Sequence, residues 1–175
     1  MGKRNREDSP RLSKYTVVVT CVLLKKGNDG KKRALILKRS SKEKEGPGLW
    51  TIPGGRLKVC DWGSGIRLHN TSRNHKRVWM NILSRAIRRE IREEAGIRVP
   101  KVILFQGREK VFLRKDKTPT LILVFQACVP SKTRARTGKE STGFCWVTEN
   151  ELERYDFIGN VKSDLVAAFR SCKKL

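Results

Sequence analysis

One stretch of nine residues constrains this chain more than any other, Arg-Glu-Ile-Arg-Glu-Glu-Ala-Gly-Ile at positions 89–97. On a helix, its glutamates Glu90, Glu93 and Glu94 are neighbours on one side, because they are separated by three and four residues. Carboxylates placed this way repel one another unless a positive group lies among them. Oxygen ligands of this kind suit Mg²⁺ or Mn²⁺, so the stretch predicts a divalent metal site.

The preceding residues predict that this helix, expected from about Val78 to Ala95, turns two of its glutamates toward the interior. A single apolar face is formed by Trp79, Leu83, Ala86, Ile87 and Ile91. Glu90 and Glu94 fall within that face, and Glu93 lies at its edge. Buried carboxylates are costly unless they are paired or metal-bound. The alternative is an ordinary solvated helix rich in glutamate and arginine.

Two further residues agree with a helix that ends just before Gly96. Arg89 precedes Glu93 by four residues and can therefore pair with it. Gly96 is placed to end the helix in the left-handed conformation. Upstream, a short strand around Trp50 runs into Pro53-Gly54-Gly55, a tight turn whose backbone can approach a ligand closely. A glycine turn before an inward-facing carboxylate helix favours a ligand site over a solvated helix.

These two segments resemble the signature of the Nudix (MutT-like) hydrolases, Gly-x5-Glu-x7-Arg-Glu-U-x-Glu-Glu-x-Gly-U, in which U is aliphatic. Positions 89–97 match its second half completely, and Gly55 resembles the opening glycine. The spacing between the halves is longer than in the family, so we expect an insertion at about residues 58–77. Counting back from Arg89 puts Asn81 at the position of the first glutamate. Asp61, within the insertion, is the alternative.

The resemblance implies roles for particular residues. Glu90, Glu93 and Glu94 would hold magnesium, together with the backbone carbonyl of Gly54, and Arg89 would orient the glutamates. Glu140, in a loop before the last expected strand, is similar to a family glutamate that serves as metal ligand or general base. The alternative for Glu140 is a solvated loop residue.

Substrate contacts are predicted less sharply. Arg39 and Lys38, at the end of an expected strand, are candidates for phosphate binding, although ordinary solvation at a strand end explains them equally well. Asn160 lies in a segment that resembles the one carrying a base-reading asparagine in nucleotide-cleaning family members. An asparagine there also fits the N-cap of the last helix, and we favour the cap.

The implied reaction is metal-dependent hydrolysis of a pyrophosphate bond in a nucleoside diphosphate linked to a further group. Glu93 or Glu140 would take the proton of the attacking water. One alternative is a pyrophosphohydrolase of RNA 5′ ends. Another is a non-catalytic Nudix-fold module that binds a nucleotide or nucleic acid.

Composition bears on partners and location. The chain carries 40 lysines and arginines against 17 acidic residues, a net charge of +23, which attracts polyanions and makes RNA a possible partner. It contains no apolar run of the roughly 18–20 residues needed to cross a bilayer, and residues 1–6 lack the apolar core of a signal peptide. We therefore expect a cytoplasmic protein with no membrane contact. The oligomeric state is left open.

The pattern of elements predicts an α/β fold. A basic, flexible tail is expected over residues 1–14 and one domain over 15–175. Strands are expected at 15–24, 34–38, 101–106, 110–114, 120–129 and 144–147, and a second helix at 161–172. Thr148 and Glu151 form the pattern of a capping box that opens a short helix. Helices before and after mixed strands favour an α/β/α sandwich of the Nudix type.

Overall fold

The computed structural model describes residues 15–63, 66–67, 77–105, 108–114 and 116–171. The expected basic tail at 1–14 and most of the expected insertion at 58–77 therefore lie outside the described residues. The strands are β1 (Thr16–Lys26), β2 (Lys32–Arg39), β3 (Trp50–Thr51), β4 (Gly54–Arg56), β5 (Ile66–Arg67), β6 (Arg77–Val78), β7 (Ile103–Leu104), β8 (Lys110–Leu113), β9 (Pro119–Cys128) and β10 (Ser141–Val147). The helices are α1 (Ile82–Ala95) and α2 (Val161–Ser171), with short 3₁₀ helices η1 (Val59–Asp61) and η2 (Glu149–Arg154).

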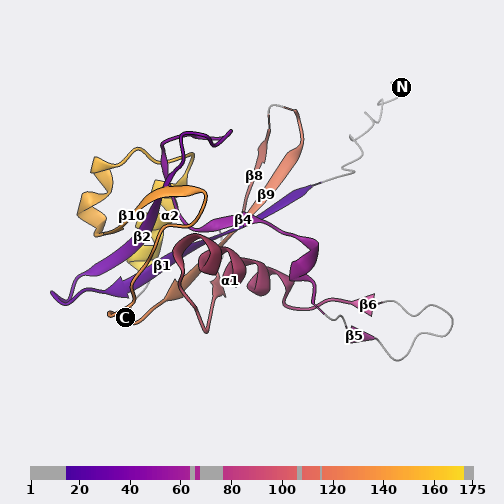
Figure 1. Ribbon diagram of the computed structural model, residues 1–175, viewed down its shortest axis with the longest axis horizontal. Helices are drawn as coiled ribbons and strands as arrows, with labels where there is room; N and C mark the ends of the chain where they lie inside the picture. Colours follow the sequence, from indigo (N-terminus) through magenta and orange to yellow (C-terminus); the bar gives the residue numbers. More distant parts are fainter. Residues whose placement is uncertain (1–14, 64–65, 68–76, 106–107, 115, 172–175) are drawn as a thin grey trace, which may run out of the picture.

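The main sheet is mixed and is organised around β1 (Figure 1). Its strand order is β10-β2-β1-β9-β7, with β3 paired to β2, β4 to β1 and β8 to β9. β1 runs parallel to β9 and antiparallel to both β2 and β4. The β-branched residues of β1 favour this central strand, since they pack well on a pleated surface that is covered on both sides.

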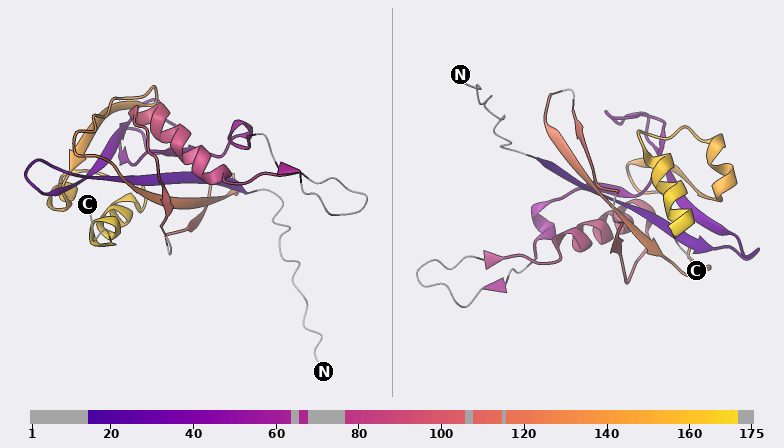
Figure 2. Two further views of the ribbon diagram at one scale, coloured as in Figure 1. Left: turned by 90° about the horizontal axis from the view of Figure 1, so that it is seen from below. Right: turned by 180° about the vertical axis from the view of Figure 1, so that it is seen from behind.

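The sheet separates two cores, one under each helix, and α1 and α2 cover opposite faces (Figure 2). Val19, Cys21 and Leu23 of β1 pack in the cluster that contains the buried residues of α1. Val22 and Leu24 pack in the cluster that contains those of α2. Because successive side chains of a strand point to opposite faces of the sheet, β1 contributes residues to both cores. The predicted α/β/α sandwich with a mixed sheet is confirmed.

The predicted start of α1 at Val78 is wrong, because the helix begins at Ile82. Arg77 and Val78 instead pair with β5 in a two-stranded sheet. Asn81 then adopts the left-handed conformation, with φ of 58°, and separates this strand from the helix. Trp79 therefore does not belong to the apolar face of α1. Its ring packs on Trp62 with centroids 5.1 Å apart, and both side chains are exposed.

Other predicted elements agree within a few residues. The strand expected at 101–106 is reduced to Ile103–Leu104 among the described residues, and the last strand begins three residues earlier than expected, at Ser141. The capping box is confirmed, since the backbone N–H and the hydroxyl of Thr148 both donate to Glu151 at the start of η2. Within the described ranges no helix combines the length and the apolar character needed to span a bilayer.

Candidate active site

The glycine turn and α1 meet directly. The backbone N–H of Gly54 donates a 2.9 Å hydrogen bond to Oε2 of Glu94. β4 is held beside β1 by the pairing of Gly54 with Thr20, and α1 packs across the same strands. A Cβ on Gly54 would lie 2.5 Å from the carbonyl oxygen of Val19, so only glycine fits here without moving the backbone.

Gly55 makes room for a second carboxylate. A Cβ added to Gly55 would lie 2.4 Å from Oε1 of Glu90 and 2.5 Å from its Cδ. Glu90 is only 6% exposed, so its carboxylate has little space to move away. The two glycines therefore give the turn its close approach to Glu94 and Glu90. Glu93 projects outward with its side chain 51% exposed, further from the interior than the edge position predicted for it, while Glu90 faces inward as predicted.

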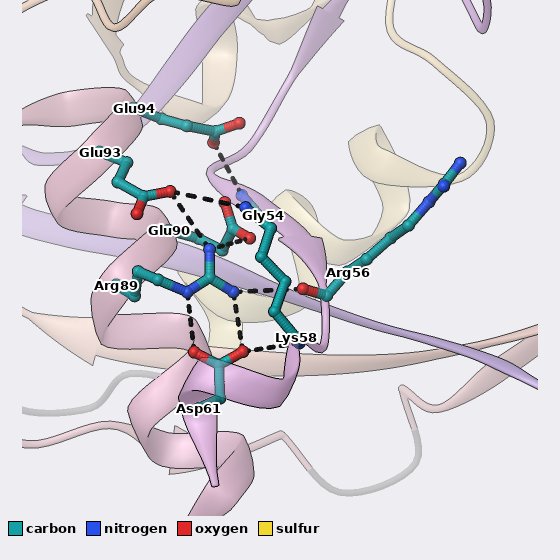
Figure 3. A network of polar contacts seen from close by, with 8 residues as sticks. All are labelled: Gly54, Arg56, Lys58, Asp61, Arg89, Glu90, Glu93 and Glu94. Atoms are coloured by element: carbon teal, nitrogen blue, oxygen red, sulfur yellow. Dashed lines mark hydrogen bonds and ion pairs between the residues drawn. The ribbon is translucent and has the colours of Figure 1, made fainter. Parts of the chain in front are cut away.

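Arg89 is the centre of a polar network around these carboxylates (Figure 3). Its Nε and Nη2 donate to the two oxygens of Asp61 at 2.7 and 2.8 Å. Its Nη1 donates to Glu90 at 2.6 Å and to Glu93 at 3.2 Å, and Nη2 also reaches the carbonyl of Arg56 at 3.2 Å. A guanidinium has five N–H donors, so all of them are in use.

Asp61 is the residue that counting back from Arg89 fails to find. It is 3% exposed, and its carboxylate also accepts the backbone N–H of Lys58 at 2.8 Å. Asp61 stands six residues after Gly55, the distance of the first glutamate from the glycine in the Nudix signature. We infer that the extra residues follow Asp61. Counting forward from Gly55 is the signal that would have found this residue.

Burial makes the inward carboxylates costly to ionise, and the positive groups near them only partly offset that cost. Burial raises the pKa of Glu94 from 4.5 to about 8, and the nearby charges of Glu90 and Glu140 add to the rise. The Gly54 N–H and the charge of Arg39 act in the opposite direction. Burial also raises the pKa of Glu90, although Arg89 partly offsets that effect. A cation beside these groups would remove the cost of ionising them.

The loop between β9 and β10 is held against the last turn of α1. The backbone N–H of Arg136 donates to the carbonyl of Ala95 at 3.0 Å. A Cβ on Gly138 would lie 2.6 Å from the carbonyl oxygen of Glu93 and 2.7 Å from Cα of Glu94. This close contact carries the loop past the carboxylates and leaves Glu140 exposed and close enough to Glu94 to raise its pKa.

Arg39 and Lys38 lie on opposite faces of the sheet, because neighbours on a strand alternate. Arg39 shares the face of α1, and its charge acts on Glu94, while its guanidinium bonds Glu43 and the carbonyl of Glu45, both at 2.8 Å. Lys38 is on the other face, with Nζ 6.0 Å from the centroid of the Trp50 ring. The structure therefore brings only Arg39 to the carboxylates.

Asn160 also lies apart from the carboxylates, at the start of α2. Its backbone carbonyl accepts the N–H of Asp164 at 3.2 Å, so the residue occupies the N-cap position that the sequence favours. Asn160 itself is exposed.

The donor set fits a hard divalent cation. Glu90 and Glu94 offer carboxylate oxygens beside the backbone of Gly54, and Glu93 offers one facing solvent. No three His, Cys, Asp or Glu side chains in the described part of the chain converge as a ready-made metal cage. Mg²⁺ is usually held by one or two carboxylates, with water and substrate phosphates completing its octahedron. Two inward carboxylates with a third facing solvent are compatible with that mode of binding.

Comparison with known proteins agrees with the fold and the signature. A sequence model of the NUDIX domain matches residues 82–169. The Nudix domain of NrtR from Shewanella oneidensis, in complex with ADP ribose, aligns with a TM-score of 0.69 and 14% identity over 95% of each chain. The MutT protein of Methanosarcina mazei aligns with a TM-score of 0.61 and 19% identity over 91% of this chain and 96% of that one.

A third similar structure is an Ap4A hydrolase of C. elegans, with a TM-score of 0.59 and 16% identity over 89% of this chain and 98% of that one. A search of curated protein sequences gives no match. The fold and the carboxylate helix define the class as a Nudix hydrolase, an enzyme that acts on pyrophosphate bonds. This chain belongs to the Nudix family.

Proposed function

We propose that this enzyme uses Mg²⁺, or Mn²⁺ in its place, to cleave a pyrophosphate bond in a nucleoside diphosphate linked to a further group. The observation that carries the proposal is the pair Glu90 and Glu94, which face inward against a glycine turn and have raised pKa values. Such a pair costs free energy unless a cation accompanies it.

Glu90, Glu94 and Glu93 would hold the metal ion, with the Gly54 carbonyl as a further ligand. When bound, the ion neutralises charge that develops on the phosphoryl group and lowers the pKa of water. Arg89 is a positioning residue, since its five donors are committed to Asp61, the glutamates and a backbone carbonyl. It holds Glu90 and Glu93 in place and does not bind substrate.

The proton of the attacking water would pass to Glu93 or to Glu140. Both are exposed; Glu93 belongs to α1, and Glu140 belongs to the loop before β10, from which its charge acts on Glu94. Arg39 is the candidate for a phosphate contact, because it shares the face of α1 with Glu94. Lys38 and Asn160 belong to the other face of the sheet, Lys38 through the alternation of β2 and Asn160 at the start of α2, so they would act only on a part of the substrate that extends there.

The test is phosphate and pyrophosphate release from a panel of nucleotides and nucleotide conjugates with Mg²⁺. Wild type, Glu94→Gln and Glu109→Gln are compared. Glu109 is exposed before β8, so its variant removes the same charge away from the site. We expect turnover by wild type and Glu109→Gln and a loss of at least about a hundredfold in kcat for Glu94→Gln. A folded wild type that turns over nothing with either metal would support the binding module instead.

The second candidate is a pyrophosphohydrolase of RNA 5′ ends, and the net charge of +23 favours it. The panel therefore includes 5′-triphosphorylated RNA. A kcat/KM for this RNA well above that for every free nucleotide would select the second candidate, and the reverse order would select the first.

A further inference from the structure

A hollow beside the carboxylates has no role in the reaction described above. It has a volume of about 420 Å³ and is lined by Arg89, Arg92, Glu93 and Arg136. The first three residues come from α1, and Arg136 comes from the loop that is held against the end of this helix. Glu93 belongs both to the hollow and to the carboxylate group, so a ligand in the hollow would be next to the reaction centre.

Two of the three arginines are available to a ligand. Arg89 is committed through all its donors. Arg92 and Arg136 are exposed, and neither makes a side-chain hydrogen bond or ion pair with any residue that the structure describes. Two guanidinium groups on one hollow, opposed there by the single carboxylate of Glu93, form an anion site with a net positive charge.

The position of Arg136 is built into the fold. Its backbone N–H is bonded to Ala95, and its side chain lies where a Cβ on Gly96 would be, 2.5 Å from Nε and 2.6 Å from Cγ. Glycine is required at position 96 for its φ of 68°, and its missing side chain also leaves the space that Arg136 occupies. The guanidinium is also near the C-terminal end of α1, where the helix dipole favours a cation.

We propose that Arg92 and Arg136 bind a phosphate group of the substrate beyond the two phosphates that flank the cleaved bond. The proposal rests on the proposed function and names a substrate class: molecules with three or more phosphates near the cleaved bond. A guanidinium can give a phosphate two parallel hydrogen bonds, which two unpaired arginines provide without breaking an existing contact. Free nucleoside polyphosphates and triphosphorylated RNA ends share this chemistry.

The test compares KM values of Arg92→Gln, Arg136→Gln and Arg98→Gln with wild type. Arg98 is exposed just after α1, so its variant loses the same charge outside the hollow. The substrates are adenosine tetraphosphate, triphosphorylated RNA and ADP-ribose, which has only two phosphates. We expect each hollow variant to raise KM about tenfold for the first two substrates, with kcat and the KM for ADP-ribose nearly unchanged. The wild-type KM values for adenosine tetraphosphate and triphosphorylated RNA show which of these two substrates is preferred.

Equal changes in KM for ADP-ribose and the tetraphosphate would contradict the proposed phosphate site. An equal effect of Arg98→Gln on KM would contradict it as well. Binding of inorganic tripolyphosphate, measured by calorimetry on the same variants with Mg²⁺, gives a readout without turnover. If wild type hydrolyses nothing but Arg92→Gln and Arg136→Gln weaken this binding, the proposed function fails and the anion site stands. If hydrolysis occurs and the variants bind tripolyphosphate as wild type does, the anion site alone fails.

Discussion

Arg89 shows how one residue determines the arrangement of several others. The Arg89 side chain is 17% exposed, and it joins η1 to α1 through Asp61 while holding Glu90 and Glu93. Its pKa is raised above the ordinary arginine range by the hydrogen bond to Asp61, so it keeps its charge at any working pH. The guanidinium of Arg89 therefore pairs with Asp61, Glu90 and Glu93, whereas Glu94 is offset by the Gly54 N–H and the charge of Arg39.

We predict that Asp61→Asn destabilises the protein by about 2–4 kcal/mol, because it leaves a partly buried guanidinium without its main partner. Urea denaturation measures the change, and Asp156→Asn is the control, since Asp156 is exposed and its contact with β3 is through the backbone. We also expect lower kcat, as Arg89 no longer holds Glu90. Equal stability of the two variants would show that the ion pair between Asp61 and Arg89 contributes little to stability.

Gly55→Ala should place a methyl group where the carboxylate of Glu90 lies. We expect a loss of about 1–3 kcal/mol in stability from overpacking and a fall of at least about tenfold in activity from the displaced glutamate. Gly143→Ala on β10 is the matched control, because the nearest atom to its added Cβ is 3.8 Å away. Full activity of Gly55→Ala would contradict the close packing of turn and helix.

The raised pKa of Glu94 predicts how stability changes with pH. The folded state binds a proton at Glu94 up to pH of about 8, whereas the unfolded chain releases it near 4.5. Stability contributed by this group is therefore complete below pH 4.5 and is lost as pH rises toward 8.

In metal-free protein, Glu94→Gln should thus become more stable relative to wild type between pH 5 and 8.5, by on the order of 4 kcal/mol. Urea denaturation at several pH values measures the difference, and Mg²⁺ should reduce it by stabilising the ionised wild type. A difference that stays constant with pH would mean that Glu94 titrates in its ordinary range.

At the scale of elements, the structure depends on a helix and two connecting segments that converge on it. The glycine turn meets α1 from β4, and the loop before β10 crosses its last turn through Arg136 and Gly138. Each contact is backbone against helix, with glycine at the point of closest approach. The loop can therefore place Glu140 near Glu94 although 46 positions separate them in sequence.

We predict that Gly138→Ala lifts this loop away from α1. The added Cβ meets backbone atoms of Glu93 and Glu94, which cannot swing aside as a side chain would. A fall of about tenfold in kcat is expected if the loop carries a group that takes part in the reaction. Steady-state kinetics beside Gly143→Ala gives the measurement, and an unchanged kcat would argue that neither the loop nor Glu140 contributes.

The contiguous parts of the site could be predicted from sequence, and the interrupted part could not. The helical spacing of Glu90, Glu93 and Glu94 follows from local geometry, so their faces and the cap at Gly96 are as expected. The partner of Arg89 is a property of tertiary structure. The insertion hides Asp61 when positions are counted back from Arg89. Counting forward from Gly55 reaches Asp61, and the contact in space shows that it is the partner of Arg89.

The start of α1 shows the same limit. Trp79 matches the helical period, and periodicity alone extends the helix back to Val78. Pairing of β6 with β5 and the left-handed Asn81 prevail over that pattern, because backbone hydrogen bonds between strands satisfy groups that a first helical turn leaves free. Arg39 and Lys38 likewise look equivalent in sequence, and only the alternation of β2 across two cores separates their roles.

At the scale of the whole molecule, the chain carries a net charge of +23, whereas its candidate site is made of carboxylates. Such a surface attracts phosphate-rich substrates over long range, and salt screens that attraction. We predict that KM for triphosphorylated RNA rises steeply between about 50 and 200 mM salt, while KM for a free nucleotide changes much less. Equal salt dependence for both substrates would show that the basic surface is not an RNA site.

The central claim is that the inward carboxylates of α1 hold a divalent metal ion. Electron paramagnetic resonance of free Mn²⁺ tests it most directly, by titrating the ion into wild type, Glu94→Gln and Glu109→Gln and then displacing it with Mg²⁺. We predict one displaceable site in wild type and Glu109→Gln, with affinity at least about tenfold weaker in Glu94→Gln. Equal Mn²⁺ affinity in all three proteins would contradict the claim.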